Sequence, residues 1–253
     1  PTTRFAVTLP ASVSLSTVGG FLEMSPTGEG FVVVAQSSSG PQLYYRAMND
    51  LEFKPIPGTE NGSQPFVSFD GQWIGFISDG SIKKVAVSGG APQKVADLGT
   101  ILSTTPSWAK DGRIIAGSLN GGMWLVPAGG GTPTPFTRLD SGETSHRGSY
   151  FLDDGETLAF QIFRSIGDEP YIAFATPDGR VIRTERAATK SRQVGHDLMI
   201  YSNLQGTIFG ARFDAKRFQI GEGVPLLSNV HVRPGACAHQ ASRRGAARHV
   251  PPV

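Results

Sequence analysis

A repeat of about 40 residues constrains this chain more than any other feature of its sequence. Glycines that close a polar turn recur at intervals of 40 to 43 residues, at positions 28, 71, 112, 155 and 195. An apolar run follows each turn. The Gly-Gly turns that come later in the second and third repeats keep the same spacing, since Gly90 and Gly131 are 41 residues apart. Such a period, with several short strands in each unit, is typical of propeller blades.

The repeat from Ser68 to Leu98 is the best preserved, with the sequence SFDGQWIGFISDGSIKKVAVSGGAPQKVADL. It contains three short strand patterns and three tight turns. Asp-Gly and Gly-Gly pairs supply the positive φ angles that such turns need. One blade cannot bury both of its faces alone, and stacking blades around a ring buries them. The repeat therefore predicts architecture and says little about chemistry.

We therefore predict an all-β fold, a β-propeller of four-stranded blades with five blades legible and a sixth incomplete. The propeller domain is expected at 1–232, with a strand at 4–9 that latches the ring. The expected blades are 21–62, 63–101, 102–148, 149–190 and 191–230. The residues assigned to structural turns are Gly28, Asp70, Gly71, Asp111, Gly112, Asp154 and Gly155. The aromatic residues expected to pack between blades are Trp73, Phe76, Trp108, Trp124, Phe160 and Phe174.

The composition suits a large β domain. The chain has 253 residues, of which 39% are hydrophobic and only 17% are charged, with 32 Gly and 18 Pro. This favours many turns and short strands over long surface helices. No apolar run approaches the roughly 20 residues of a membrane-spanning helix. Because the sequence begins at Pro1, we expect it to be a piece of a longer protein, whose anchor or export signal would lie outside it.

The basic charge of the chain comes from its last 21 residues. The segment 233–253 contains four arginines and no acidic residue, whereas the rest of the chain is close to neutral. No strand pattern continues there. Two interpretations are a disordered basic tail and an out-of-frame translation, and the second is favoured because another strand pair is due at Arg233. The charge distribution predicts no nucleic-acid face. Cys237, the one cysteine, excludes an intrachain disulfide and a cysteine-based metal site.

The repeats resemble the TolB-type, WD-like propeller repeats of bacteria. The resemblance rests on the repeat 68–98, on GGGTPTPFTRLDSGETSHR, on PQLYYRAMNDLEFKPIPGTENGSQPF and on FDAKRFQIGEGVPLL, and it covers about residues 4–234. More narrowly, the chain resembles the C-terminal propeller region of bacterial serine/threonine protein kinases. That resemblance implies a six-bladed ring, a parent protein anchored in the membrane, and a location on the extracytoplasmic side.

Motifs for catalysis are missing from the sequence. It has no glycine-rich phosphate loop, no P-loop, no Asp-Phe-Gly and no Gly-x-Ser-x-Gly elbow. The five histidines show no metal-ligand spacing with another His, Cys or carboxylate. We therefore expect a piece that is not itself an enzyme, with no cofactor and no metal. The pair Asp153-Asp154 is interpreted as part of a turn rather than as paired catalytic carboxylates.

One polar cluster precedes the strands of the fourth blade, at a place where side chains tend to face the central channel. It comprises Glu143, Thr144, Ser145, His146 and Arg147. One interpretation is a contact for a ligand or ion at the mouth of the channel. The other, which we favour, is a hydrogen-bonded loop between blades.

Two functional hypotheses of different class follow. The first is a non-catalytic sensor or interaction module that binds a protein or small ligand on one propeller face. The second is a propeller that gates a peptidase or other hydrolase. A soluble periplasmic TolB-like binding protein is a further alternative. The sequence upstream and downstream in the parent gene would distinguish them.

Overall fold

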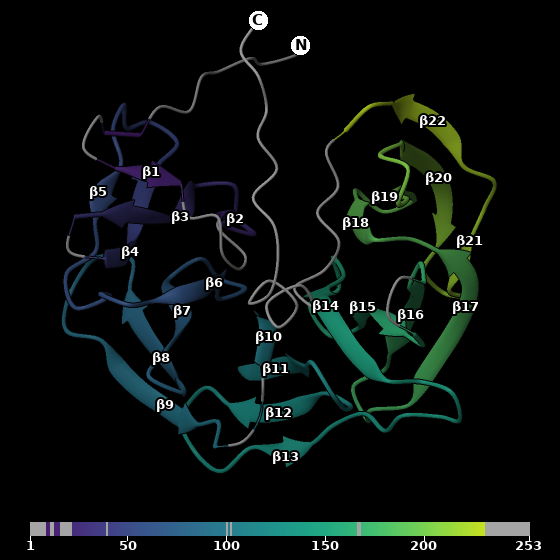
Figure 1. Cartoon of the computed structure of the whole chain (residues 1–253), viewed down its shortest axis with the longest axis horizontal. Coiled ribbons are helices and arrows are strands. Elements are labelled where there is room, and N and C mark those ends of the chain that lie inside the picture. The colour runs from purple at the N-terminus through teal and green to yellow at the C-terminus, as the bar shows by residue number, and fades with distance from the viewer. Residues whose placement is uncertain are drawn as a thin grey trace, which may run out of the picture.

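The protein, in a computed structural model, is built from antiparallel β-sheets. The structure describes residues 9–10, 13–15, 22–38, 40–99, 101, 103–165 and 168–230. Every helix-or-strand element in these ranges is a strand, and the strands form five sheets that follow each other in chain order around a common centre (Figure 1). The predicted all-β propeller is therefore confirmed. No helix in the described part of the chain could cross a membrane.

The strands have the following bounds. Sheet 1 contains β1 (Ser14–Leu15), β2 (Leu22–Met24), β3 (Gly30–Ser37), β4 (Gly40–Ala47) and β5 (Lys54–Pro55). Sheet 2 contains β6 (Ser63–Val67), β7 (Trp73–Ser78), β8 (Ser81–Ala86) and β9 (Gln93–Asp97). Sheet 3 contains β10 (Ser103–Trp108), β11 (Arg113–Ser118), β12 (Trp124–Pro127) and β13 (Thr134–Pro135). Sheet 4 contains β14 (Ser145–Phe151), β15 (Leu158–Phe163), β16 (Tyr171–Ala175) and β17 (Val181–Ala187). Sheet 5 contains β18 (Lys190–Val194), β19 (Leu198–Ser202), β20 (Ile208–Asp214), β21 (Gln219–Ile220) and β22 (Val224–Leu227).

Each sheet has four strand positions, although sheets 1 and 5 contain five strands. In sheet 1, β1 and β2 both pair with β3 on the edge away from β4. In sheet 5, β21 and β22 both pair with β20 on the edge away from β19. One strand position is therefore split in each of these two sheets, and the ring has five four-stranded blades. The described strands form no sixth sheet. The predicted latch at 4–9, apart from Leu9, and the tail 233–253 lie outside the described residues.

The recurring turn glycines join the innermost strand of each sheet to the second strand. All five have the left-handed backbone that glycine favours, with φ between 63° and 86°. In sheet 2, Asp70 Oδ1 accepts hydrogen bonds from Ser68 Oγ at 2.6 Å and from Gln72 N at 3.0 Å. A Cβ on Gly71 would lie 2.8 Å from Thr27 Oγ1 of sheet 1. The turn therefore needs glycine both for its backbone and for the close approach of two blades.

Three blade boundaries differ from those expected. The first blade begins before residue 21, because β1 (Ser14–Leu15) pairs with β3. β14 begins at Ser145 and β18 at Lys190, so residues 145–148 and 190 belong to the blade that follows. The glycine turns that carried the sequence pattern lie after the innermost strand. They therefore mark the interior of a blade, and the crossover between blades has no such signature.

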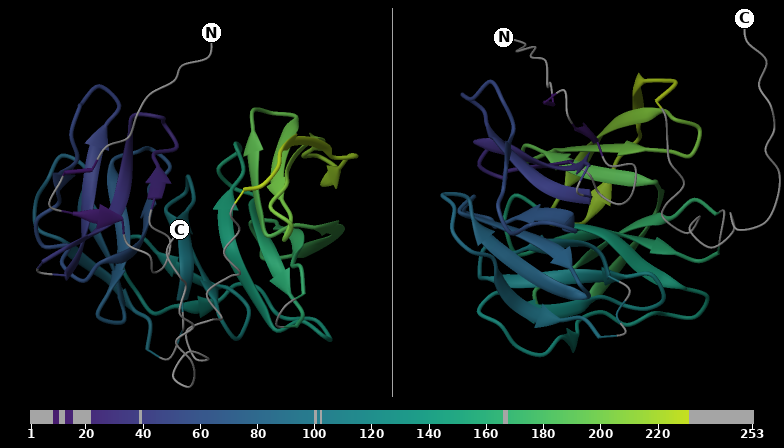
Figure 2. Two further views of the ribbon diagram at one scale, coloured as in Figure 1. Left: turned by 45° about the horizontal axis from the view of Figure 1, so that its top comes forward. Right: turned by 60° about the vertical axis from the view of Figure 1, so that its left-hand side comes forward.

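Apolar side chains fill the spaces between consecutive sheets. The second strands carry most of this core: Gly30–Ala35 of β3 and Leu158–Ile162 of β15 are buried throughout. Consecutive sheets stand beside each other (Figure 2), and four of the buried clusters contain side chains from two consecutive sheets. Of the six aromatic residues predicted to pack between blades, Phe76, Trp108, Phe160 and Phe174 lie in these clusters.

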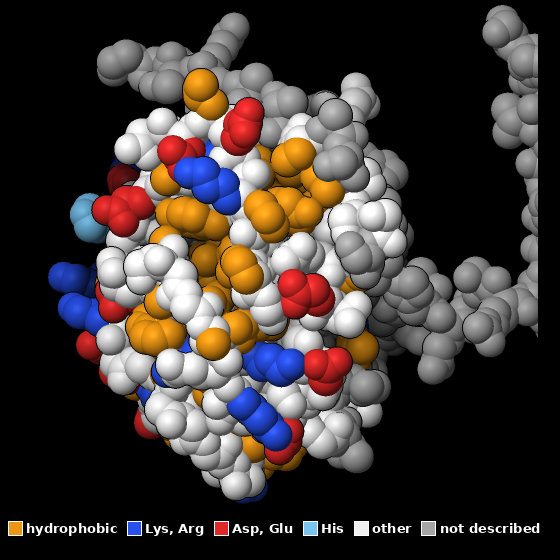
Figure 3. Space-filling view, turned by 90° about the vertical axis from the view of Figure 1, so that its left-hand side faces the viewer, with side chains coloured by type: hydrophobic (Ala, Val, Ile, Leu, Met, Phe, Trp, Pro, Cys, Tyr) orange, Lys and Arg blue, Asp and Glu red, His pale blue; other side chains and the backbone are white. Residues whose placement is uncertain are grey.

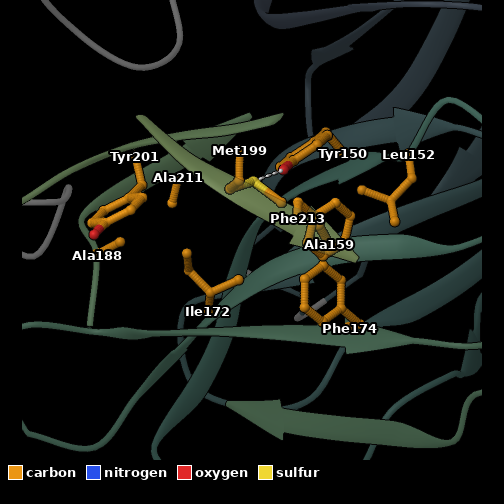
Figure 4. Packing of buried hydrophobic residues seen from close by; sticks show 10 residues of the cluster. All are labelled: Tyr150, Leu152, Ala159, Ile172, Phe174, Ala188, Met199, Tyr201, Ala211 and Phe213. Carbon is orange, nitrogen blue, oxygen red and sulfur yellow. Dashed lines mark hydrogen bonds between the residues drawn. The ribbon is translucent and has the colours of Figure 1, made fainter. Parts of the chain in front are cut away.

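The cluster between sheets 4 and 5 illustrates this packing (Figure 4). Tyr150 of β14 points across to sheet 5, where its hydroxyl lies 3.2 Å from Met199 Sδ. Phe174 of β16 stacks on Phe213 of β20 with ring centroids 5.3 Å apart. Burial raises the pKa of the Tyr150 phenol to about 12, so it stays protonated at neutral pH.

The innermost strands β2, β6, β10, β14 and β18 lie nearest the centre of the ring (Figure 1). Sheet 5 meets sheet 1 there, where Arg192 Nη2 of β18 lies 3.3 Å from Glu23 Oε1 of β2. The outer side of the first sheets mixes apolar and charged side chains (Figure 3). The most exposed large apolar residue among those described is Leu51, in the β4–β5 connection, at 89%.

Candidate functional site

A groove of about 380 Å³ lies on sheet 3, beside the polar cluster that the sequence singled out. It is formed by the β11–β12 hairpin and by the start of the connection from β13 to β14. This is the place where loops of a propeller face can present side chains to a ligand. The residues that line it are Ile101, Ser118, Asn120, Gly121, Gly122, Met123, Trp124, Pro135, Thr137, Arg138 and Leu139.

The groove has a buried floor and partly exposed apolar walls. Met123 and Thr137 are buried, Trp124 is half-buried, and Leu139 is exposed. A Cβ on Gly122 would overlap the carbonyl oxygen of Thr137, so glycine is required for the hairpin to lie against the end of sheet 3. By contrast, a Cβ on Gly121 would come no nearer than 3.6 Å to Ser118 Oγ. The floor is thus set by close backbone packing.

Polar groups stand at the rim. Ser118 Oγ donates to Asn120 Oδ1 at 3.2 Å and accepts from Asn120 N at 3.4 Å, which fixes the tip of the hairpin. Arg138 is exposed and has neither an ion pair nor a side-chain hydrogen bond with a described residue. The groove therefore offers a free guanidinium, an amide and two apolar walls, a combination that suits binding by shape and hydrogen bonding.

Glu143 of the predicted cluster is buried and fully engaged. Its side chain is 2% exposed, and its carboxylate accepts from Arg183 Nε at 2.6 Å and from Arg183 Nη2 at 3.0 Å. It also accepts from the backbone N of Asp140 at 2.7 Å. This bidentate pair ties the loop before β14 to β17, the outer strand of the same sheet.

His146 lies beneath the groove with no exposed surface. Thr137 Oγ1 accepts from Met123 N at 2.8 Å and lies 2.8 Å from His146 Nδ1. The Glu143 carboxylate can only accept, so Nε2 of His146 carries the proton that it donates to Glu143 Oε2 at 3.1 Å, and Nδ1 of the neutral ring accepts from Thr137 Oγ1. The ring also packs on Phe160, with centroids 5.0 Å apart.

The pKa directions agree with this assignment. Burial lowers the pKa of His146 against the opposing effect of Glu143, so the imidazole is neutral. Burial alone would raise the pKa of Glu143. The hydrogen bonds from Arg183, Asp140 N and His146 outweigh it and lower that pKa to about 2.

The other three members of the cluster are also held within the protein. Thr144 donates from its backbone N and its Oγ1 to the carbonyl oxygen of Phe163, at 2.7 and 3.1 Å. Ser145 is buried and accepts from Arg147 Nε at 2.8 Å. Arg147 Nη2 donates to Leu119 O at 2.8 Å, in the hairpin that borders the groove.

The cluster thus supports the groove from below. The backbone N of His146 donates to Gly121 O at 3.0 Å, next to the contact of Arg147 with Leu119. Both contacts hold the β11–β12 hairpin in place. A ligand in the groove would meet this hairpin, and Glu143 and His146 would act by positioning it.

One other expectation has a structural outcome. Asp154 accepts from Thr157 Oγ1 at 2.6 Å and from the backbone N of Glu156 and Thr157, as expected for a turn residue. Within the described residues, no group of three or more His, Cys, Asp or Glu is arranged to hold a metal ion.

The sequence analysis did not find the groove itself. Trp124 was interpreted as packing between blades and instead forms a groove wall, and Asn120, Arg138 and Leu139 were not singled out. Hairpin length gave no signal for the groove. The β11–β12 hairpin, with residues 119–123 between its strands, is longer than the β7–β8 hairpin, which turns at Asp79-Gly80. The equivalent hairpins of sheets 4 and 5 are at least as long, with 164–170 and 203–207 between their strands.

Comparison with known proteins identifies the fold. No protein-family model and no curated protein sequence matches the chain. Solved structures do match. TolB from Acinetobacter baumannii has a TM-score of 0.62 at 16% identity, over 83% of this chain and 55% of that one, so this chain spans about half of that protein. A putative TolB from Agrobacterium tumefaciens has a TM-score of 0.59 at 16% identity, over 82% and 81%.

The likeness extends beyond this group. The β-propeller domain of Cps50 (Swd1) from Myceliophthora thermophila has a TM-score of 0.59 at 8% identity, over 85% of this chain and 75% of that one. Identities this low show a shared fold. The chain is thus similar to TolB-type propellers in structure.

Proposed function

We propose that this chain is a non-catalytic propeller module that binds a partner, a protein segment or a small ligand, in the groove of sheet 3. The groove carries the proposal, because apolar walls, a free guanidinium and a rigidly held hairpin converge on it. Its volume of about 380 Å³ suits one protruding side chain or a molecule of similar size.

The wider context of this proposal is a receptor. We infer that the parent protein is a membrane-anchored bacterial serine/threonine kinase and that this propeller senses a ligand on the extracytoplasmic side. The support is the resemblance of the repeats to the C-terminal propeller regions of such kinases. A kinase domain and a membrane span upstream in the parent gene are expected. A downstream α/β-hydrolase domain would contradict the receptor role and support a gate for a hydrolase.

The groove is tested by site-specific photocrosslinking. Replacing Leu139 by p-benzoylphenylalanine places the reactive group on the groove wall. The same replacement of Leu51, which is 89% exposed on sheet 1, provides the matched control. In cells that produce the parent protein, we expect a discrete adduct from position 139 and none from position 51.

A charge-reversal variant provides a second test of binding in the groove. Arg138→Glu reverses the charge at the rim of the groove and should reduce the adduct at position 139 several-fold. Lys54→Glu, on an exposed residue of sheet 1, should leave it unchanged. Equal labelling from both crosslinker positions, or an adduct insensitive to Arg138→Glu, would contradict binding in the groove.

A further inference from the structure

The groove of sheet 3 is lined by hydrogen-bond donors that no described residue uses. The side-chain amide of Asn120 and the backbone N–H groups of Gly121 and Gly122 belong to its lining, and none of them donates to a described residue. The same holds for the guanidinium of Arg138 at the rim. Donors that line a groove without an acceptor favour a ligand that presents oxygen atoms.

The oxygen atoms of the same hairpin are held by the protein around it. The carbonyl oxygens of Leu119, Gly121 and Met123 accept hydrogen bonds at 2.8, 3.0 and 2.8 Å from donors in β14 and in the connection from β13 to β14. Asn120 Oδ1 accepts from Ser118 Oγ at 3.2 Å. The hairpin is thus fixed through oxygen atoms, and its unused N–H groups are left for a ligand.

The charge of the groove is positive. Arg138 is the one charged residue among those that line it. The two acidic residues of the β13–β14 connection lie against Arg183 instead: Asp140 Oδ2 is 3.9 Å from Arg183 Nη2, and Glu143 Oε1 is 2.6 Å from Arg183 Nε. Because Arg183 takes both carboxylates, Arg138 has no counter-ion among the described residues. A single guanidinium matches one carboxylate, which it can bind through two parallel hydrogen bonds.

Apolar side chains stand beside these donors. Trp124 and Leu139 form the walls of the groove, and the fully buried Met123 belongs to its floor. A carboxylate alone would leave these side chains uncovered. The last residue of a peptide carries its carboxylate and its side chain on one Cα atom, so an apolar C-terminal residue meets both requirements within a groove of about 380 Å³. In aspartate or glutamate the carboxylate is the end of the side chain itself, and no apolar group accompanies it.

We propose that the groove binds the free C-terminus of a partner polypeptide whose last residue is apolar, an inference that rests on the binding role proposed for the groove. The terminal carboxylate accepts from Arg138 and from the N–H groups of the hairpin, and the last side chain lies against Trp124 and Leu139. Because β14 already holds the hairpin in place, little ordering of this loop opposes binding.

The test is fluorescence anisotropy of the whole chain with pentapeptides that carry fluorescein at the N-terminus. The first peptide is Gly-Ser-Gly-Ser-Leu as the free acid, and the second is the same peptide as the C-terminal amide. The third is the amide of Gly-Ser-Gly-Ser-Glu, which has the charge of the first but carries its carboxylate on a side chain. We expect the first peptide to bind at least about tenfold more tightly than either amide, as for charge-assisted hydrogen bonds to a positioned carboxylate.

Two variants separate the two parts of the groove. Arg138→Gln should remove most of the preference for the free acid over the amide. Leu139→Ser should remove most of the preference for leucine over serine at the last position of the free acid. Arg180→Gln, at an exposed arginine of the β16–β17 turn, should change neither preference. The unfolding midpoints of the three variants should agree with that of the unmodified chain, because all three residues are exposed.

Amide resonances of the whole chain locate the bound peptide. The backbone ¹H resonances of Gly121 and Gly122 should move downfield when the free acid is added, and the amide should leave them in place. Equal affinity for the acid and the amide, including no binding of either, would overturn the inference, as would equal effects of Arg138→Gln and Arg180→Gln. If this inference alone fails, the photocrosslinker at position 139 still gives an adduct in cells, whereas failure of binding in the groove removes that adduct too.

Discussion

The buried Glu143 carboxylate makes the free energy of unfolding of this propeller depend on pH. The substitution Glu143→Gln should remove this part of the pH dependence. A pKa lowered from 4.5 in the unfolded chain to about 2 in the folded one corresponds to about 3 kcal/mol of stability. Because the folded pKa is the lower one, this contribution is complete above about pH 5 and is lost as the pH falls toward 2. The neutral His146 adds to the loss, since it must also take up a proton on unfolding below its ordinary pKa.

The substitution acts on the charge and on the hydrogen bonds together. Glutamine has the shape of Glu143, but its NH₂ group would face the donors of Arg183, Asp140 N and His146 Nε2. We expect Glu143→Gln to lower the free energy of unfolding by about 2–4 kcal/mol at pH 7. The deficit should shrink to below about 1 kcal/mol near pH 2.5, where most of the contribution of the carboxylate is lost.

The measurement is denaturant unfolding followed by tryptophan fluorescence between pH 7 and pH 2.5. Other carboxylates titrate equally in both proteins, so the difference between the two curves isolates Glu143. The matched control is Glu156→Gln in the turn before β15, where the glutamate is exposed and its side chain has no hydrogen bond with a described residue. A deficit that stays constant across this range would refute the reasoning, because the effect would then come from shape rather than charge.

Two further predictions concern packing. Gly122→Ala should lower the free energy of unfolding by about 1–3 kcal/mol, because its Cβ would overlap the carbonyl oxygen of Thr137. Gly121→Ala should cost less than half as much, and equal effects of the two would show that the close approach is relaxed in solution. The side chain of Phe160 has no exposed surface, so Phe160→Ala should lower the free energy of unfolding by about 3–5 kcal/mol. Leu51→Ala should cost almost nothing in the same denaturant titration, and a small effect of Phe160→Ala would contradict the tight core between sheets 3 and 4.

The propeller could be predicted from sequence because its determinants are local. Gly71 and Gly155 each stand in a short turn whose backbone only glycine adopts easily, and apolar runs follow them directly. A period of this kind is visible without knowing any contact between blades. The crossovers between blades have no such local requirement, which explains why the third and fourth blades meet at Ser145 rather than at 149.

The sites depend on contacts that the sequence does not display. An aromatic residue in a strand, such as Trp124, gives no sign of whether its neighbour will be a sheet or solvent. Arg192 and Glu23 meet across 169 positions of the chain. The sequence analysis singled out His146, but the burial of its ring depends on contacts with Thr137 and Glu143. Both residues lie in the connection between β13 and β14, and no sequence pattern predicts the path of that connection.

The way in which the sheets are joined also sets an order for folding. Each apolar cluster that spans two sheets joins sheets that follow each other in the chain, from 1 and 2 to 4 and 5. Blades can therefore form from nearby segments and add to a neighbour at a modest loss of chain entropy. The contact between Glu23 and Arg192 instead closes a loop of most of the chain, and the described residues contribute an ion pair between partly exposed side chains there. Assembly should run around the ring, and this closing contact should form last and open first.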